Sequence, residues 1–297
     1  MQFDSYCIKC QIDRQFKTAR ELFSPEDAQR YLMDVMDMIL HAPKGVCASF
    51  FTPQLQELRA KYGAGGDLYA EEKRWANETV MPLLPQIEQR IEASPDPLLT
   101  ALKFSQAGNF MDFAIIRANE VSDTVPQLLE RAPDTPLDEN EYRHFAEDLA
   151  SAKQLLILGD NAGEIALDTL LVKQIRRQFP NLRILYGVRG GIALNDATRE
   201  DAAFVGMDKL AEVIDNGSCI SATELAYLGE EMKRELEKSD VILAKGQANF
   251  ESMAGCGGNV YYNFLCKCER YCAMLDVPKY TGMFLCDRRL PKLKIFP

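Results

Sequence analysis

A short stretch near the middle of the chain holds the side chains best suited to chemistry. The apolar run 155–158 leads through Gly159 into Asp160 and Asn161, and Glu164 follows where a periodic segment opens. Such a run is typical of a buried strand in a parallel sheet. Carboxylate and amide oxygens suit Mg²⁺ or Mn²⁺ better than a soft metal. The periodic segment 165–179 predicts a helix whose start favours an anion, so the stretch has the parts that phosphoryl transfer requires.

The same residues have a plainer interpretation, a turn that leads into a helix cap, and the stretch alone leaves both open. Other strand ends favour the functional interpretation. Asn195 and Asp196 lie in the connection after a second predicted strand, and Lys245 and Asn249 lie at the end of a fourth. Parallel strands bring these ends to one edge of the sheet, where ligands bind. A lysine directly after an apolar strand is costly to bury unless it is paired, which indicates a site rather than independent turns.

A further polar pair lies in the first half of the chain. Asn109 and Asp112 are three residues apart, so on a helix both would project from one face. Gly108 can end one helix and allow another to begin at Asn109. A helix cap and a polar pair that faces a cleft are both consistent with this spacing.

The pattern of the chain changes near residue 150. Residues 12–119 are largely helical in pattern, as in 27–40, where apolar residues recur every three or four positions after Ser24 and Pro25 at the helix start. Strands then alternate with helices, which is typical of βαβ units and a parallel sheet. We therefore expect a helical domain over 1–150 and an α/β domain over 151–297. The predicted strands are 155–158, 183–188, 212–215, 239–250 and one or two from Leu275 and 283–286, with helices at 165–179, 201–206 and 223–238.

Composition narrows the classes of protein that this chain can represent. The chain has 297 residues, 47% of them apolar, which is enough for a sizeable core. Its net charge of −10 and lack of a long basic run argue against nucleic acid or an anionic membrane as the main partner. We find no signal-peptide pattern and no apolar run long enough to span a bilayer, so we expect a cytoplasmic protein.

The cysteines give a weaker signal. Nine cysteines in a chain without an export signal favour reduced thiols or metal ligands over a disulfide framework. Cys7 and Cys10 form a lone CxxC pair, which fits half of a zinc site, a redox pair or two small buried side chains. Cys266, Cys268 and Cys272 are candidates to meet that pair in space.

Taken together, these motifs resemble the metal-dependent damage-control phosphatases, formerly domain of unknown function eighty-nine. The resemblance rests on Gly-Asp-Asn-Ala-Gly-Glu at 159–164, Asn-Asp-Ala-Thr at 195–198, Lys-Gly-Gln-Ala-Asn-Phe-Glu at 245–251 and Gly-Asn-Phe-Met-Asp at 108–112. They occur in the family's order over nearly the whole chain. The pair Cys7 and Cys10 resembles the CxxC of the family's stand-alone microbial branch.

The resemblance implies an N-terminal helical domain packed on a Rossmann-like α/β/α sandwich with a mainly parallel sheet. It also implies hydrolysis of phosphate monoesters on small metabolites, such as sugar phosphates or damaged phosphometabolites, with Mn²⁺, Mg²⁺, Co²⁺ or Ni²⁺ as cofactor. By similarity, the metal is held by Asp160, Asn161 and Asp196. The groups that face the substrate or the nucleophile are Glu164, Asn109, Asp112, Lys245 and Asn249. We therefore expect Asp160, Glu164 and Lys245 to be catalytic.

Other functions compete with this one. A Rossmann-type protein that binds a nucleotide or cofactor is disfavoured, because Gly159 and Gly163 do not have the spacing of the dinucleotide fingerprint. Carboxyl methyl transfer, proposed for relatives in the family, lacks a donor-binding motif here. A cysteine-based zinc or iron–sulfur scaffold is a further alternative.

Overall fold

A six-stranded sheet forms the centre of the computed structural model, which describes residues 3–111 and 125–290. The strand order is β3-β2-β1-β4-β5-β6, and every neighbouring pair is parallel except β5 and β6. The prediction of an α/β fold with a mainly parallel sheet is therefore confirmed. The strands are β1 Gln154–Leu158, β2 Arg183–Val188, β3 Glu212–Asp215, β4 Val241–Lys245, β5 Val260–Cys266 and β6 Thr281–Cys286.

The strand order places a crevice between β1 and β4. The chain runs outward from β1 through β2 to β3 and then returns to the other side of β1 as β4. Connections leave β1 and β4 in opposite directions at this switch point, which opens a crevice at the carboxyl ends of the strands. Asp160 follows the end of β1, and Lys245 is the last residue of β4. The topology thus brings the two predicted motifs to one place.

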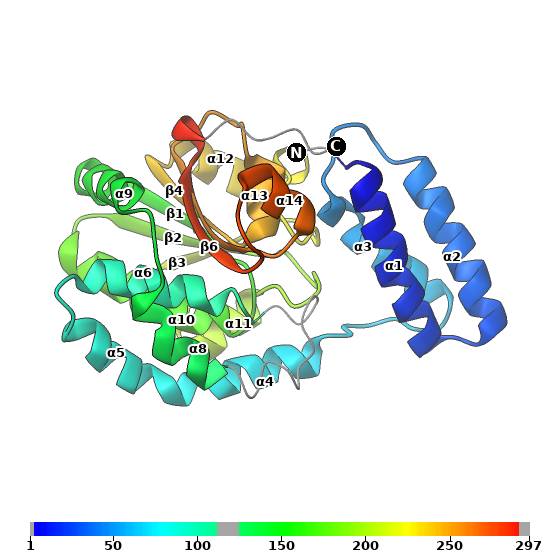
Figure 1. Ribbon diagram of the computed structural model, residues 1–297, viewed down its shortest axis with the longest axis horizontal. Coiled ribbons are helices and arrows are strands. Elements are labelled where there is room, and N and C mark those ends of the chain that lie inside the picture. The colour runs from blue at the N-terminus through cyan, green and yellow to red at the C-terminus, as the bar shows by residue number, and fades with distance from the viewer. Residues whose placement is uncertain (1–2, 112–124, 291–297) are drawn as a thin grey trace.

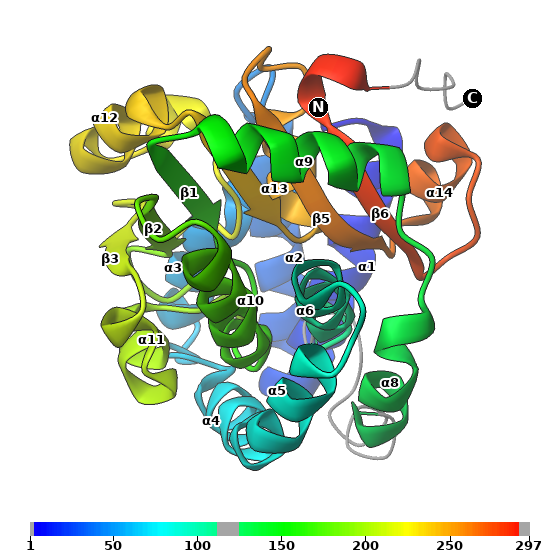
Figure 2. The same cartoon turned by 90° about the vertical axis from the view of Figure 1, so that its left-hand side faces the viewer.

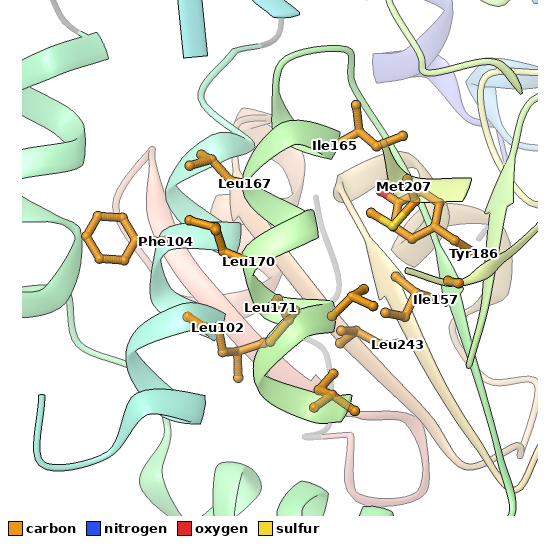
Figure 3. Close-up of a cluster of buried hydrophobic side chains, with 14 of the residues drawn as sticks. Leu102, Phe104, Ile157, Ile165, Leu167, Leu170, Leu171, Tyr186, Met207 and Leu243 are labelled. Carbon is orange, nitrogen blue, oxygen red and sulfur yellow. The ribbon is translucent and has the colours of Figure 1, made fainter. Parts of the chain in front are cut away.

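Helices cover both faces of the sheet (Figures 1 and 2). One face packs against α6 and α10, where Leu170 and Leu171 of α10 lie among Leu102 of α6, Ile157 of β1 and Leu243 of β4 (Figure 3). The other face has a second core, to which Met232, Phe250 and Tyr271 contribute. The first layer comprises α4 Ala70–Val80, α5 Leu84–Glu92, α6 Pro97–Gly108, α8 Val125–Arg131, α9 Glu139–Ser151, α10 Glu164–Gln178 and α11 Arg199–Val205, and the second α12 Glu230–Lys238, α13 Gln247–Met253 and α14 Glu269–Leu275.

The N-terminal helical unit, residues 3–62, has a core of its own. It contains α1 Ser5–Leu22, α2 Pro25–Leu40 and α3 Thr52–Lys61, and lies beside the α/β body in Figure 1. Its buried hydrophobic side chains come from 19–58, and among the described residues Ile220 and Ala222 join them from elsewhere in the chain. Ser24 caps α2 and Pro25 begins it, as the sequence predicts. The domain boundary near residue 150 stays a prediction, while the buried cores group the helices after residue 70 with the sheet.

Several predicted elements differ from the structure. Strand β4 ends at Lys245 rather than 250, because Gly246 turns the chain with a φ of 78° and α13 begins at Gln247. Strand β5 was not predicted, since Asn263 divides its apolar residues into two runs of three that follow a glycine-rich loop. Helix α12 begins at Glu230 instead of 223, because the chain before it is held in an irregular loop. Leu275 ends helix α14 and belongs to no strand.

Within the described part of the chain, no helix is both long enough and apolar enough to cross a membrane. The cytoplasmic location expected from the sequence stays a prediction.

Candidate active site

Asp160 lies at the centre of the crevice and is held by amide donors. Its Oδ2 accepts hydrogen bonds from Nδ2 of Asn109 at 2.9 Å and from Nδ2 of Asn161 at 2.8 Å. Its Oδ1 faces Nη2 of Arg189 at 3.8 Å, too far for a hydrogen bond. Burial, reinforced by the carboxylates of Asp196 and Glu164, raises the pKa of Asp160 well above its ordinary value. Asp160 is therefore a buried carboxylate whose charge is poorly neutralised.

Glu164 begins α10 and is fully enclosed. Its Oε1 accepts from Nζ of Lys245 at 2.5 Å, and its Oε2 accepts from the side-chain amides of Asn109 and Asn161, each at 3.0 Å. The last turn of α6 approaches it closely, because a Cβ on Gly108 would lie only 3.2 Å from Cα of Glu164. Close packing of two helices thus brings Asn109 to both Glu164 and Asp160.

Lys245 is completely buried, and its ammonium group is saturated. Nζ donates to Glu164, to Oδ1 of Asp168 at 3.0 Å and to the carbonyl oxygen of Ser105 at 3.0 Å. Although burial disfavours the charged lysine, Asp168 and Glu164 outweigh it and raise the pKa of Lys245. Asp168 also accepts from the hydroxyls of Ser105 and Tyr186, at 2.5 and 2.6 Å. Lys245 thus holds Glu164 in place and has no N–H left over for another ligand.

Asp196 lies beside Asp160 through a pairing of the two loops. The backbones of Asn161 and Asp196 form an isolated antiparallel bridge, and the N–H of Ala197 donates to the carbonyl of Asp160 at 2.7 Å. The Nε atom of Arg189 donates to Oδ2 of Asp196 at 2.6 Å. The sequence-predicted metal residues Asp160, Asn161 and Asp196 are thus brought together.

Asn249 joins the ends of two strands. Its Nδ2 donates to the carbonyl oxygens of Lys245 at 2.6 Å and Gly159 at 3.3 Å. Its Oδ1 accepts from Oγ1 of Thr223 at 2.8 Å and from Nη2 of Arg189 at 3.3 Å. The structure therefore places Asn249 at the site, with its amide engaged by protein groups. Asp112, the remaining predicted residue, lies outside the described residues.

Three participants were absent from the sequence-based prediction. Arg189 follows β2 directly, so the signal that singled out Lys245, a cation after an apolar strand, was available for it too. Asp168 lies four residues after Glu164, on the same face of α10. Ser221, whose hydroxyl donates to Oδ1 of Asp196 at 2.8 Å, lies in an irregular loop and gave no signal.

The chemistry of these donors fits a divalent cation. Four buried carboxylates meet here; Arg189 and Lys245 form ion pairs with them, and the positive charge of buried Lys267 also acts on Asp160. An added positive charge would relieve the repulsion that raises the pKa of Asp160. The described residues hold no cluster of three or more His, Cys, Asp or Glu side chains suited to a metal, so the ligand set needs an amide. Oδ1 of Asn161 accepts from Asn195 at 2.7 Å and keeps a second lone pair.

A cavity of about 340 Å³, within the range of small-molecule sites, lies at the end of α6, where Gln106, Ala107 and Phe110 line it. Its wall includes Phe110, next to Asn109 in the chain, and Leu265, whose N–H donates to Oδ1 of Asn109 at 3.0 Å. Tyr280 adds an aromatic ring 5.5 Å from that of Phe110, and Arg131 adds a cation. Asn109 therefore connects the cavity to the carboxylates.

Comparisons with known proteins show the family and the fold of this chain. The family model for the damage-control phosphatase ARMT1-like domain matches residues 4–283. A damage-control phosphatase of Archaeoglobus fulgidus is 32% identical over 274 residues, which cover 91% of this chain and 93% of that protein. Damage-control phosphatase PH1575 of Pyrococcus horikoshii is 28% identical over 235 residues, 78% of each chain. The crystal structure of PH1575, titled a duf89 family protein, shares the fold with a TM-score of 0.81 at 23% identity, covering 97% of this chain and 99% of that one.

Proposed function

This chain belongs to the damage-control phosphatase family with an ARMT1-like domain, and on that premise we propose that it hydrolyses phosphate monoesters of small metabolites with a divalent metal ion. We assign the metal to Asp160, Asn161 and Asp196. The substrates we propose are sugar phosphates or related damaged phosphometabolites, and the metal is Mn²⁺, Mg²⁺, Co²⁺ or Ni²⁺. The CxxC pair of Cys7 and Cys10 has no assigned role in this reaction.

The observation that carries the proposal is the state of Asp160. Asp160 is only 7% exposed and lies close to the carboxylates of Asp196 and Glu164. Its Oδ1 nevertheless accepts no hydrogen bond from another described residue. A buried carboxylate of this kind is costly unless a cation or a proton neutralises it. A bound divalent ion would supply that charge, and it would polarise a phosphoryl oxygen and lower the pKa of a water molecule.

The residues around Asp160 have different proposed roles. Lys245 and Asn109 orient Glu164, which is fully enclosed and lies beside Asp160 as a fixed negative group. Arg189 is 3% exposed and lies between Asp196 and Asn249, so we assign it to the charge that develops on the phosphoryl oxygens. In this role Arg189 takes the place that the sequence suggested for Lys245, whose donors are all used.

The cavity beside Asn109 is where we place the alcohol part of the substrate. Phe110 and Tyr280 offer ring faces for an apolar or sugar surface, and no hydrogen bond or ion pair joins the guanidinium of Arg131 to another described residue. A site of this kind would bind the leaving group through contacts distant from the reacting phosphorus. Such contacts contribute to selection among phosphate esters.

The test is a screen of phosphorylated metabolites, with release of inorganic phosphate measured in the presence of each of the four metal ions and in EDTA. We expect phosphate release that depends on the metal and is nearly abolished in Asp160→Ala. Equal turnover in EDTA and in Mn²⁺, or an Asp160→Ala variant as active as the wild type, would contradict the assignment.

A further inference from the structure

We propose that the N-terminal helical unit is part of the scaffold of the active site, acting through a bracing segment at residues 220–223. This inference rests on the proposed function, since it concerns how Asp196 is positioned for a metal ion. The bracing segment follows β3 and is completely buried between the two parts of the molecule, with exposed fractions from 0% to 6%.

Alternate residues of the bracing segment face opposite ways. Ser221 donates to Oδ1 of Asp196 at 2.8 Å, and Thr223 donates to Oδ1 of Asn249 at 2.8 Å. Ile220 and Ala222 instead belong to the core of the N-terminal helical unit. The chain bends at Ser221 and Ala222, so the division rests on the contacts that each side chain makes. Ser221 and Thr223 therefore bind residues of the site, and Ile220 and Ala222 anchor the segment in the N-terminal helical unit.

Further contacts with the helical unit follow the segment in the chain. The backbone N–H of Cys47 donates to Oε1 of Glu224 at 2.8 Å, and the rings of Phe50 and Tyr227 lie 5.1 Å apart. Ala248, the neighbour of Asn249 in α13, also packs against the core of the helical unit. The helical unit thus contacts the chain that follows the bracing segment and the residue next to Asn249.

The hydroxyl of Ser221 has a specific consequence for Asp196. Oδ2 of Asp196 is bound by Arg189, and Oδ1 is bound by Ser221, so the carboxylate is oriented at both oxygens. Hydrogen bonds of this kind fix the direction of a ligand's lone pairs, and their loss typically weakens metal binding 10- to 100-fold. We therefore assign Ser221 and Thr223 as positioning residues, and the packing of Ile220 as what keeps them in place.

The test measures Mn²⁺ affinity by isothermal titration, a readout independent of turnover, in four variants of the full chain. Ser221→Ala is expected to bind Mn²⁺ about tenfold more weakly, and Ser221→Thr to restore binding. Ile220→Ala removes packing alone and is expected to weaken binding severalfold, although it touches no proposed ligand. Tyr31→Phe removes the hydrogen bond to Gln15 inside the helical unit and serves as the matched control, with Mn²⁺ affinity unchanged.

Two results overturn the inference and leave the proposed function intact. One is wild-type Mn²⁺ affinity, within twofold, in both Ser221→Ala and Ile220→Ala. The other is an equal loss of affinity in Tyr31→Phe, which indicates general destabilisation instead of bracing. A wild-type chain that binds no Mn²⁺ would overturn the metal assignment itself, and the inference with it.

Discussion

The ammonium group of Lys245, at the end of β4, donates to the carboxylate of Glu164, at the start of α10, across 2.5 Å. Both side chains are completely buried, and Asp168 and the carbonyl of Ser105 take the other two N–H groups of the lysine. This contact ties the strand on one side of the crevice to the helix on the other. Its geometry assigns Lys245 to holding the site together.

Removing the lysine should therefore destabilise the protein strongly. Lys245→Met leaves Glu164 and Asp168 buried without their cation, and loss of one partner of such a pair costs about 3–5 kcal/mol. The double variant Lys245→Met/Glu164→Gln removes one of those charges and should recover part of that loss. Urea unfolding measures both, and a Lys245→Met variant as stable as the wild type would contradict the pairing.

Asp160→Asn should inactivate the enzyme and stabilise the metal-free protein. The substitution removes a buried negative charge, while the amide oxygen still accepts from Asn109 and Asn161. We expect a gain of about 1 kcal/mol, which corresponds to about 2–4 °C in Tm. Thermal unfolding in EDTA measures whether the Tm of the variant rises or falls. A lower Tm for the variant would show that the Asp160 charge is well compensated.

The pH dependence of that difference follows from the raised pKa of Asp160. A carboxyl whose pKa is raised by folding contributes stability below the unfolded value of about 4, and this contribution is lost as the pH rises through the folded value. The Tm of Asp160→Asn should therefore exceed that of the wild type by more at pH 8 than at pH 5. If the difference in Tm, measured without metal, stays constant or shrinks from pH 5 to pH 8, the pKa of Asp160 is not raised.

A single methyl group at Gly246 should disturb the site. A Cβ there would lie 2.0 Å from Oδ2 of Asp160, and the φ of Gly246 is +78°. Gly255→Ala is the matched control, because its φ of +90° imposes similar backbone strain while its Cβ would meet nothing within 4 Å. We expect both variants to lose about 1 kcal/mol from strain. Only Gly246→Ala should lose metal affinity and most of its phosphatase activity, and equal activity in the two variants would argue against a fixed Asp160.

The cavity beside Asn109 makes a prediction about selectivity. Arg131→Ala should raise the KM for preferred metabolite phosphates about tenfold, because it removes one charged hydrogen bond to the substrate. It should leave kcat for p-nitrophenyl phosphate within twofold. Steady-state kinetics on the two kinds of substrate separate these effects. An unchanged KM for every metabolite phosphate would remove the cavity from the substrate site.

The sequence predicted which residues gather at the crevice because strand ends in a parallel sheet are predictable. Asp160, Asp196 and Lys245 each follow or end an apolar strand, and parallel pairing requires those ends to meet. The role of Lys245 was harder to predict from the sequence, since its partners Asp168 and Ser105 come from helices whose packing no local pattern encodes. Ser221 and Thr223 were missed for a related reason. Thr223 was predicted as the first residue of a helix over 223–238 and Ser221 was assigned to no element, yet contacts with distant residues hold both in an irregular loop.

The central claim is that Asp160, Asn161 and Asp196 together hold one divalent ion. The most direct measurement is the number of Mn²⁺ ions bound per chain, determined by equilibrium dialysis with metal analysis, for the wild type, Asp160→Asn, Asp196→Asn and the double variant. We predict one ion per wild-type chain and a loss of binding in each variant. One tightly bound ion per chain in the double variant would place the metal elsewhere and contradict the account.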